Sequence, residues 1–260
     1  MIYHYLFIAS SNAEYHSSRS HASIWQLLRH IMRKHKIFMI GYYLVLLAGL
    51  YPLLKWDKIQ VFLFINQHYN ACLDTLFYYC TNLGNGITYI LLLCLLYLRG
   101  VSFRKIGIGL VSFGTMSIVV QILKRVFFSS SFRPLKVLMD EGKGMYLHIV
   151  DKVEVLTDLS FPSGHSATIF AAVCFLELIS KRQHAGYSLG LLLLAIVTAY
   201  SRVYLCQHFY TDIYAGAWIG GTITFMVYVV LLKYESTVRG RWLSALYKRI
   251  DAYTHLAEKP

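Results

Sequence analysis

Residues 190–230 read GLLLLAIVTAY, then SRVYLCQHFYTD, then IYAGAWIGGTITFMVYVV, so two apolar runs flank one polar stretch, Ser201–Asp212. A bilayer core of about 30 Å takes roughly 20 apolar residues per helix, and each run, with its neighbours, approaches that length. The stretch between them places an arginine, a histidine and an aspartate where the two helices reach one membrane edge. This part of the chain predicts a helical membrane protein with polar chemistry at that edge.

The remainder of the chain follows the same pattern of apolar blocks and polar connections. Its 260 residues are 57% hydrophobic and 15% charged, which is too apolar for an ordinary soluble domain. Six segments are predicted to cross the membrane: about 37–54, within 76–98, about 106–128, about 164–180, about 186–205 and about 210–232. The fold class is therefore predicted to be all-α, a bundle of six transmembrane helices within residues 37–232.

The formal net charge of +12 is compatible with nucleic-acid binding, but the basic residues form no single stripe or tail. They cluster at the ends of the apolar segments instead. The four clusters are Arg29, Arg33, Lys34 and Lys36; Arg99, Arg104 and Lys105; Lys181 and Arg182; and Lys233, Arg239, Arg241, Lys248 and Arg249. With six crossings all four share one side, which the positive-inside rule makes the cytoplasm. We therefore expect the bilayer, not nucleic acid, as a partner, and both termini in the cytoplasm.

Two flanks lie outside the predicted bundle. Residues 1–36 form a cytoplasmic appendage whose last part, Ile24–Lys36, is amphipathic and basic, as is typical of a helix on a membrane surface. Residues 233–260 form a cytoplasmic tail with apolar residues near helical spacing, and a second surface helix is expected there. These apolar residues are Trp242, Leu246, Ile250 and Tyr253.

Three polar stretches meet at the membrane face opposite the basic clusters: 124–134, 160–167 and 201–212. The second contains PSGH. A helix that begins near Gly164 offers free backbone N–H groups to an anion, and glycine lets a ligand approach closely. Ser163 adds a hydroxyl group, and the imidazole that follows is placed to give or take a proton. These features predict a phosphate site at the helix N-terminus.

Arginines in the other two stretches extend this predicted site. Arg133 and Arg202 carry planar guanidinium groups that bind phosphate through two points. Lys124 or Arg125 can add another positive charge, but adjacent helical residues point about 100° apart, so only one can face the site. We expect Lys124, because it shares a helix face with Gln121.

His208 and Asp212 are four residues apart, which puts both on one helix face if the sixth helix begins near His208. A carboxylate beside an imidazole fixes its tautomer and stabilises its charged form. The other ring nitrogen then remains free as a nucleophile or base. This pair beside an anion site indicates phosphoryl transfer through a covalent intermediate.

These stretches resemble the three motifs of the type 2 phosphatidic acid phosphatase (PAP2) superfamily: K-x6-R-P, P-S-G-H and S-R-x5-H-x3-D. The second and third match fully, at 162–165 and 201–212. The first departs: Arg133 and Pro134 are present, but Lys124 stands nine residues before Arg133 instead of seven. The resemblance covers about residues 37–232 and implies a fold of the PAP2 / acid phosphatase–haloperoxidase type.

The resemblance implies a role for each matched residue. His208 would attack phosphorus and form a phosphohistidine, Asp212 would orient His208, and His165 would protonate the leaving oxygen. The phosphate oxygens would be held by Lys124, Arg133, Ser163, the Gly164 amide and Arg202. The family uses no metal, so no metal or other cofactor is expected. The sequence shows no CxxC pair and no Cys/His cluster with zinc spacing.

The expected function is hydrolysis of the phosphate end of a lipid phosphate or diphosphate. The family acts on polyprenyl diphosphate, phosphatidic acid, phosphatidylglycerol phosphate and lipid A, and the sequence does not choose among them. Two alternatives stay open: the same mechanism on water-soluble phosphate esters, and a non-enzymatic transporter that keeps the fold. Charges at one membrane edge favour the enzyme, because transporters more often carry them at mid-membrane. We expect a bacterial inner membrane with a periplasmic site; the oligomeric state is not indicated.

Other residues are assigned structural roles. Glu177 is expected to pair with Lys181, one helical turn later. His148, in the long connection before the second motif, is expected to be solvated. Cys206, in the short outer connection, is expected to react with an impermeant thiol reagent if it is free and exposed. Gly216 and Gly220 are four residues apart, a spacing of small residues that predicts close helix packing.

Overall fold

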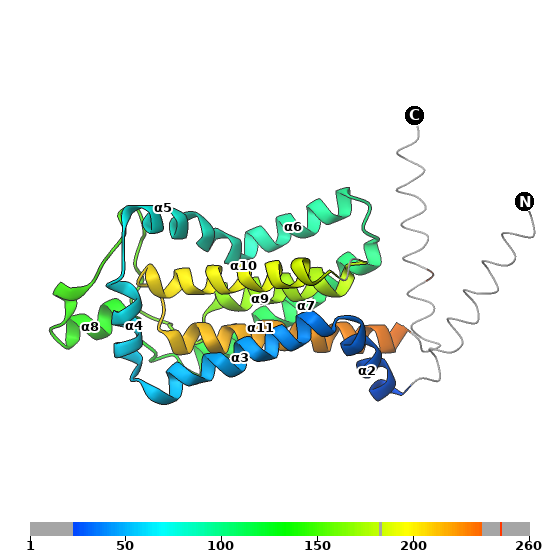
Figure 1. Cartoon of the computed structure of the whole chain (residues 1–260), viewed down its shortest axis with the longest axis horizontal. Helices are drawn as coiled ribbons and strands as arrows, with labels where there is room; N and C mark the ends of the chain where they lie inside the picture. Colours follow the sequence, from blue (N-terminus) through cyan, green and yellow to red (C-terminus); the bar gives the residue numbers. More distant parts are fainter. Residues whose placement is uncertain (1–22, 182–183, 236–244, 246–260) are drawn as a thin grey trace, which may run out of the picture.

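The structure is a computed structural model that describes residues 23–181, 184–235 and 245. Within these residues it is helical and contains no strand, which confirms the all-α prediction (Figure 1). The elements are α2 (Ile24–Lys34), α3 (Lys36–Lys55), α4 (Lys58–Asn66), α5 (Ala71–Cys80), the 3-10 turn η1 (Thr81–Gly84), α6 (Gly86–Leu98), α7 (Phe103–Ile122), the π turn η2 (Leu123–Phe127), α8 (Pro134–Asp140), the 3-10 turn η3 (Gly144–Tyr146), α9 (Gly164–Ile179), α10 (Ala185–Tyr204) and α11 (Tyr210–Glu235).

Each predicted segment contains a helix, but the six are not equivalent. In the described part of the chain, four helical stretches are long and apolar enough to cross a membrane: α3, α7 with η2, α10 and α11. The second segment is the pair α5 and α6, bent by 66° at η1, which would make a fifth crossing. The fourth segment, α9, is apolar but has only 16 residues. Helix length and composition alone therefore do not reproduce the predicted count of six.

Helix α9 is the central helix of the bundle, with α11, α10 and α7 packed around it (Figure 1). Two glycines of α11 allow the closest of these contacts. A Cβ on Gly216 would lie 2.4 Å from the Ser163 carbonyl oxygen, and one on Gly220 would lie 2.1 Å from the Ala167 carbonyl oxygen. No side chain fits in either space, so the predicted close packing is confirmed.

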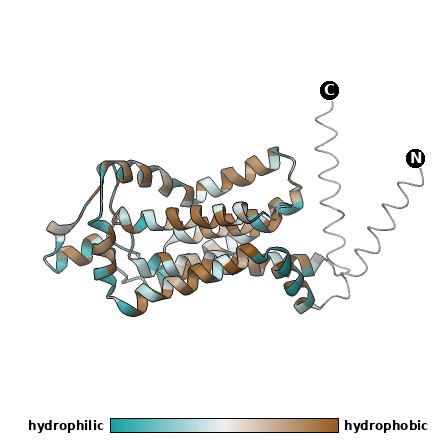
Figure 2. Ribbon diagram, viewed as in Figure 1, coloured by the Kyte–Doolittle hydropathy of each residue, from teal (hydrophilic) through white to brown (hydrophobic). Residues whose placement is uncertain are grey.

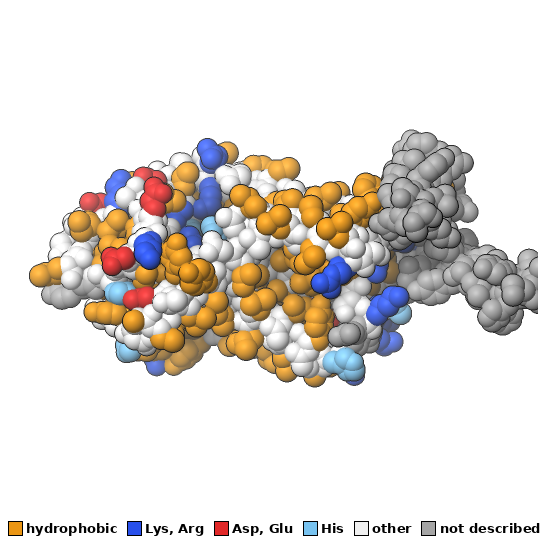
Figure 3. Space-filling model, turned by 90° about the horizontal axis from the view of Figure 1, so that it is seen from above, with side chains coloured by type: hydrophobic (Ala, Val, Ile, Leu, Met, Phe, Trp, Pro, Cys, Tyr) orange, Lys and Arg blue, Asp and Glu red, His pale blue; other side chains and the backbone are white. Residues whose placement is uncertain are grey.

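The two ends of the bundle differ. Figure 1 shows α4, α5 and α8 at one end and α2 at the other. The starts of α3 and α7, and the ends of α6, α9 and α11, lie at the α2 end, so the described basic clusters share that end. Apolar residues run along the middle of the helices and hydrophilic ones gather at the ends (Figure 2). Figure 3 shows the same distribution on one face, with acidic side chains far from α2.

Helix α2 is present as the sequence predicts. It begins with a capping box, in which Ser23 Oγ accepts from the Gln26 N–H and Gln26 Oε1 accepts from the Ser23 N–H. Its apolar residue Ile31 is buried against the bundle, while Trp25 is exposed. That this helix lies on a membrane stays a prediction. The rest of the appendage and the expected tail helix lie outside the described residues.

His148 is not solvated, contrary to prediction. Its Nε2 lies 2.8 Å from Asp74 Oδ1, and its ring stacks on Tyr69 at 3.7 Å. Asn66 bonds both backbone groups of His148, accepting from its N–H and donating to its carbonyl oxygen, at 2.8 Å each. The long outer connection is thereby tied to α4 and α5. Sequence spacing could not indicate these contacts, because the partners are more than 70 residues away.

Glu177 does not pair with Lys181, so this prediction is also wrong. Its Oε1 lies 2.9 Å from His35 Nδ1, and its Oε2 accepts from Ser188 Oγ at 3.0 Å. The carboxylate is only 1% exposed. A buried carboxylate needs partners inside the protein. Here His35, between α2 and α3, and Ser188 of α10 supply them at the α2 end.

Cys206 is fully buried rather than exposed, because the connection between α10 and α11 folds back into the core with Leu205 and Phe209. Burial raises the pKa of the Cys206 thiol to about 12. A thiol reagent therefore meets neither an accessible sulfur nor a thiolate at this position.

Candidate active site

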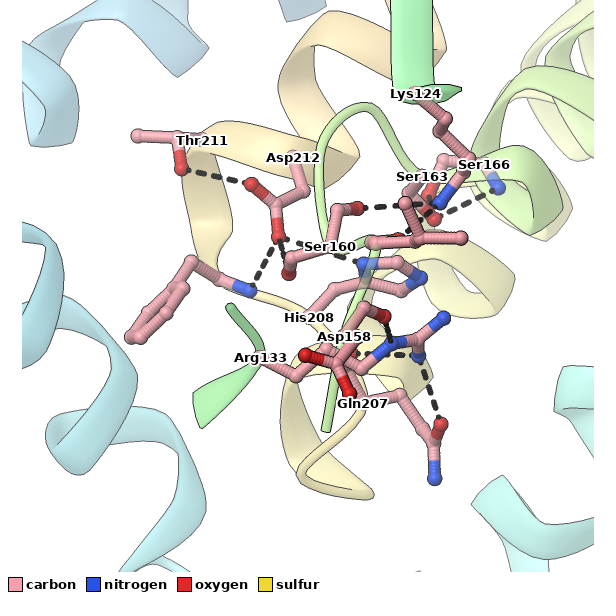
Figure 4. Close-up of polar contacts among 12 residues, drawn as sticks. Lys124, Arg133, Asp158, Ser160, Ser163, Ser166, Gln207, His208, Thr211 and Asp212 are labelled. Carbon is pink, nitrogen blue, oxygen red and sulfur yellow. Dashed lines mark hydrogen bonds and ion pairs between the residues drawn. The ribbon is translucent and has the colours of Figure 1, made fainter. Parts of the chain in front are cut away.

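Four parts of the chain form one polar cluster at the end of the bundle opposite α2. They are the π turn after α7, the start of α8, the N-terminus of α9 and the connection before α11. Figure 4 shows Lys124, Arg133, Ser163, His208 and Asp212 grouped around the same point. The three stretches predicted to converge do so.

His208 lies just before α11, not within it, since this helix begins at Tyr210. Its Nδ1 is 3.4 Å from Asp212 Oδ2. The same carboxylate oxygen accepts the Phe209 N–H at 3.0 Å. The pair is therefore formed by the turn at the helix start, not by a shared helix face. With Nδ1 toward the carboxylate, Nε2 is the free nitrogen of His208.

The environment keeps His208 neutral. The side chain is 2% exposed, and burial, together with the charges of Arg133 and Arg202, lowers its pKa to about 3 against the opposing effect of Asp212. Desolvation disfavours the imidazolium form. At neutral pH the ring therefore keeps a lone pair, which a nucleophile needs.

Helix α9 begins at Gly164 as predicted, and Ser163 caps it. Ser163 Oγ accepts from the Ser166 N–H at 3.4 Å and from Ser166 Oγ at 3.1 Å, while its own hydroxyl hydrogen stays available. The Ser163 N–H donates to the Asp212 carbonyl oxygen at 3.0 Å, so the two motifs are joined through the backbone. A Cβ on Gly164 would meet only Val120, at 4.0 Å, which leaves room for a ligand beside the helix start.

Lys124 is buried in the cluster, and Arg125 lies outside it. Lys124 Nζ donates to the Leu159 carbonyl oxygen at 2.6 Å and to that of Ser160 at 3.4 Å. Arg125 is exposed and its Nε donates to Gln121 Oε1 at 3.1 Å. Lys124 thus faces the site as expected, but the expected shared face with Gln121 is wrong.

The helix puts Gln121 with Arg125, four residues later, as an α-helix does, and the π turn Leu123–Phe127 falls at Lys124. The Phe128 N–H donates to the Leu123 carbonyl oxygen at 2.8 Å, an i to i+5 bond. Such a turn takes one more residue than an α-helical turn, so it adds a residue between Lys124 and Arg133. Part of the extra spacing in the first motif therefore lies within the helix.

Arg133 hydrogen-bonds to two connections, the one before α9 and the one between α10 and α11. Its Nε donates to the Asp158 carbonyl oxygen at 2.8 Å, and its Nη1 donates to the carbonyl oxygen and Oε1 of Gln207 at 2.9 and 3.0 Å (Figure 4). Gln207, whose side chain also donates to the Glu154 carbonyl oxygen at 2.8 Å, was not found from the sequence. Burial lowers the pKa of Arg133, with Asp212 and Asp158 opposing.

Arg202 differs from the other two cations because one of its buried side-chain nitrogens has no partner in the described chain. Its Nη1 donates to Thr81 Oγ1 at 2.6 Å, but the buried Nε has no partner among the described residues. Thr81 comes from η1, and no sequence motif pointed to it. Arg202, Arg133 and Lys124 all lie close enough to His165, the second residue of α9, to interact electrostatically with its ring.

The cluster holds more buried positive charge than negative charge. Lys124, Arg133 and Arg202 are each more than nine-tenths buried, and Asp212 is the buried carboxylate among them. Buried charges are costly unless they are paired. The excess of two positive charges matches a phosphate dianion. Elsewhere in the described residues, no group of three or more His, Cys, Asp or Glu side chains could hold a metal ion.

The fold and this anion site define an integral membrane protein of the phosphatase type, and sequence comparison places it in a family. The model of the PAP2 superfamily matches residues 105–235, half of the chain, and the chain belongs to this superfamily.

The chain is also similar to individual proteins. The undecaprenyl-diphosphatase of Sulfolobus acidocaldarius is 28% identical over 173 residues, which are 65% of this chain and 76% of the relative. The crystal structure of Aquifex aeolicus LpxE is similar with a TM-score of 0.56 and 26% identity, over 67% of this chain and 96% of that one. A transmembrane PAP2 type phosphatidylglycerolphosphate phosphatase from Bacillus subtilis, at 19% identity, shares the fold with a TM-score of 0.53, over 76% of this chain and 95% of that one.

Proposed function

We propose that this protein is a lipid phosphatase that removes phosphate from a lipid phosphate or diphosphate through a phosphohistidine on His208. The observation that carries the proposal is the excess of buried positive charge around the neutral His208, with Arg202 Nε left unpartnered. A phosphate group would supply both the missing negative charge and the missing hydrogen-bond acceptor.

The proposed reaction has two steps. In the first, His208 Nε2 attacks phosphorus, the P–N bond forms, and the bond from phosphorus to the leaving oxygen breaks. His165 donates its proton to that oxygen, and Asp212 stabilises the His208 ring through Nδ1. In the second step water attacks phosphorus, His165 takes the proton from the water, and the P–N bond breaks to release phosphate. Lys124, Arg133, Arg202, Ser163 and the Gly164 amide hold the phosphate oxygens in both steps.

A lipid substrate is favoured over a water-soluble ester by the surroundings of the cationic cluster. The segment between Lys124 and Arg133 exposes a group of apolar side chains. They are Val126, Phe127, Phe128 and Phe132. Apolar groups exposed beside a buried anion site suit a molecule with a phosphate end and a hydrocarbon body. The names of the Sulfolobus and Bacillus relatives point to lipid-linked phosphates as well.

We further propose that the site faces the periplasm of a bacterial inner membrane. Support comes from the basic residues at the α2 end of the bundle, which the positive-inside rule places in the cytoplasm. The site at the other end would then meet lipid phosphates in the outer leaflet.

The test is phosphate release from purified protein with polyprenyl diphosphate, phosphatidic acid, phosphatidylglycerol phosphate, lipid A and a water-soluble phosphate ester. We expect release from at least one lipid, loss of turnover in His208→Ala, and an acid-labile phosphoprotein during turnover. His165→Ala should lose a factor on the order of 10²–10⁴, as for a missing general acid. His68→Ala, which changes an exposed histidine outside the cluster, is the control. A well-folded His208→Ala protein with near-normal release would overturn the mechanism.

A further inference from the structure

The break in the second span lies against the active site. Helices α5 and α6 meet at an angle of 66°, and the turn between them, η1, packs on both α9 and α10. This turn comes before residue 105, where the match to the PAP2 superfamily begins. It therefore brings residues from outside the matched region to the site.

Thr81, the first residue of η1, holds Arg202 from 121 positions away in sequence. Thr81 Oγ1 accepts the Arg202 Nη1–H at 2.6 Å, and Arg202 is 7% exposed. The guanidinium group is planar, so a bond that fixes Nη1 also restricts the direction of the opposite edge. That edge carries Nε, which is buried and has no partner within the described chain.

Gly84, the last residue of η1, brings the same turn against the second motif. A Cβ at this position would lie 2.8 Å from the His165 carbonyl oxygen and 2.9 Å from the His165 Cβ. Only glycine permits this approach, because the backbone oxygen of a helix cannot move aside as a side chain can. One turn of four residues thus contacts both Arg202 and His165.

The break is built by its own hydrogen bonds, independently of the site. Asn85 caps α6 by accepting the Ile87 N–H at 3.0 Å, and Thr88 Oγ1 donates to the Asn82 carbonyl oxygen at 2.7 Å. These bonds stop α5 from continuing into α6 as one straight helix. The turn is therefore held in place by hydrogen bonds of its own, and Arg202 is bonded to it through Thr81.

We infer that Thr81 is a positioning residue for phosphate binding: it fixes Arg202 so that the unused Nε edge faces the phosphate oxygens. The inference rests on the proposed function, since it takes a phosphate group as the ligand. Without the Thr81 hydroxyl, Arg202 would keep its charge but lose its fixed direction. Binding of a phosphate-like anion should weaken although no residue that touches it has changed.

The test uses Thr81→Val, which keeps the shape and removes the hydroxyl, with Thr81→Ser as the conservative variant. Thr75→Val is the matched control, because it removes an exposed hydroxyl of α5, bonded to the Ala71 carbonyl oxygen at 3.0 Å, without touching the break or Arg202. The first measurement is the dissociation constant of orthovanadate, from thermal stabilisation of the purified protein. We expect Thr81→Val to weaken binding by about 10-fold to 100-fold, the range for a lost hydrogen bond to a charged group. Thr81→Ser should recover most of the affinity, and Thr75→Val should match wild type.

The second measurement separates this inference from the proposed function. With a lipid that the wild type cleaves, Thr81→Val should raise KM and lower kcat, since Arg202 would hold phosphate both before and during transfer. Equal orthovanadate binding by Thr81→Val and wild type, or an equal loss in Thr75→Val, would overturn the inference. A wild type that binds orthovanadate and cleaves no lipid phosphate would overturn the proposed function, while the binding series still decides the role of Thr81. If Thr81→Val does not fold, Thr81→Ala replaces it in the same comparison.

Discussion

Ser160 Oγ donates a hydrogen bond of 2.5 Å to Asp212 Oδ2, and both side chains are buried. The same oxygen faces His208 Nδ1. Ser160 also presents its backbone carbonyl oxygen to Lys124 Nζ. One serine outside the matched motif residues therefore lies between Lys124, which is proposed to bind phosphate, and the carboxylate that is proposed to orient the nucleophile.

We expect Ser160→Ala to lower kcat by about 10-fold with little change in KM, because a hydrogen bond to a charged group contributes on the order of 1.5–3 kcal/mol, part of which orients Asp212. Rapid-quench measurement of phosphohistidine formation would show the slower step. In an Asp212→Asn background the same change should have little further effect. Ser188→Ala is a matched control, since it removes a buried serine from the buried carboxylate Glu177 at the other end of the bundle. Additive effects of Ser160→Ala and Asp212→Asn would contradict this role.

Substitution of Lys124 and of Arg125, the two basic residues that follow α7, should lower kcat/KM to very different extents. Lys124→Ala removes a buried charge from the cluster and is expected to cost a factor on the order of 10²–10³ in kcat/KM. Arg125→Ala removes an exposed side chain bonded to Gln121 and should cost much less. Steady-state kinetics on both variants measures the two losses in kcat/KM. The reverse ranking would mean that Arg125, and not Lys124, serves the site.

The contact between α9 and α11 should tolerate no side chain at Gly220. In Gly220→Ala the new Cβ would collide with the Ala167 carbonyl oxygen, so the helices must separate. We expect a loss of about 1–3 kcal/mol in stability, as for overpacking, and a loss of activity because these helices carry His165 and Asp212. Thermal unfolding in detergent and phosphate release measure the two effects. Gly190→Ala in α10, with open space around the position, is the control and should be neutral or slightly stabilising.

Membrane orientation can be read from two cysteines. Cys72 is exposed in the first turn of α5, near the end of the bundle that holds the site, whereas Cys206 is buried. An impermeant thiol reagent applied to intact cells should label wild type more strongly than Cys72→Ser. Removal of Cys206 should leave the labelling unchanged. Labelling of Cys72 only after permeabilisation would reverse the proposed orientation.

Activity should not depend on a divalent metal, since the proposed phosphate ligands are cations and N–H groups of the protein itself. We expect full phosphate release in the presence of a chelator, and inhibition by orthovanadate, which adopts the five-coordinate geometry of the transferring phosphoryl group. A complete loss of release on chelation, restored by magnesium, would count against this mechanism.

Local sequence signals determined most of the helices and the central motif residues. Apolar blocks predicted where helices run, because each block has to match the thickness of the bilayer. The PSGH stretch predicted the start of α9 at Gly164, since serine caps and glycine exposes a helix N-terminus. The four-residue spacing of Gly216 and Gly220 indicated a close helix contact on the face where α9 now lies. These features depend on residues close together in the chain.

The tertiary structure alone decided which distant residues complete the site. Thr81 reaches Arg202 across 121 positions, and His35 pairs with Glu177 across 142. Hydrophobic periodicity shows which face of a helix is buried, but it does not show which other helix covers that face. A buried polar group takes the nearest partner that the packing supplies, whatever its distance in sequence. For this reason the sequence could predict Arg202 as a phosphate ligand, and only the packed bundle shows the threonine to which it is bonded.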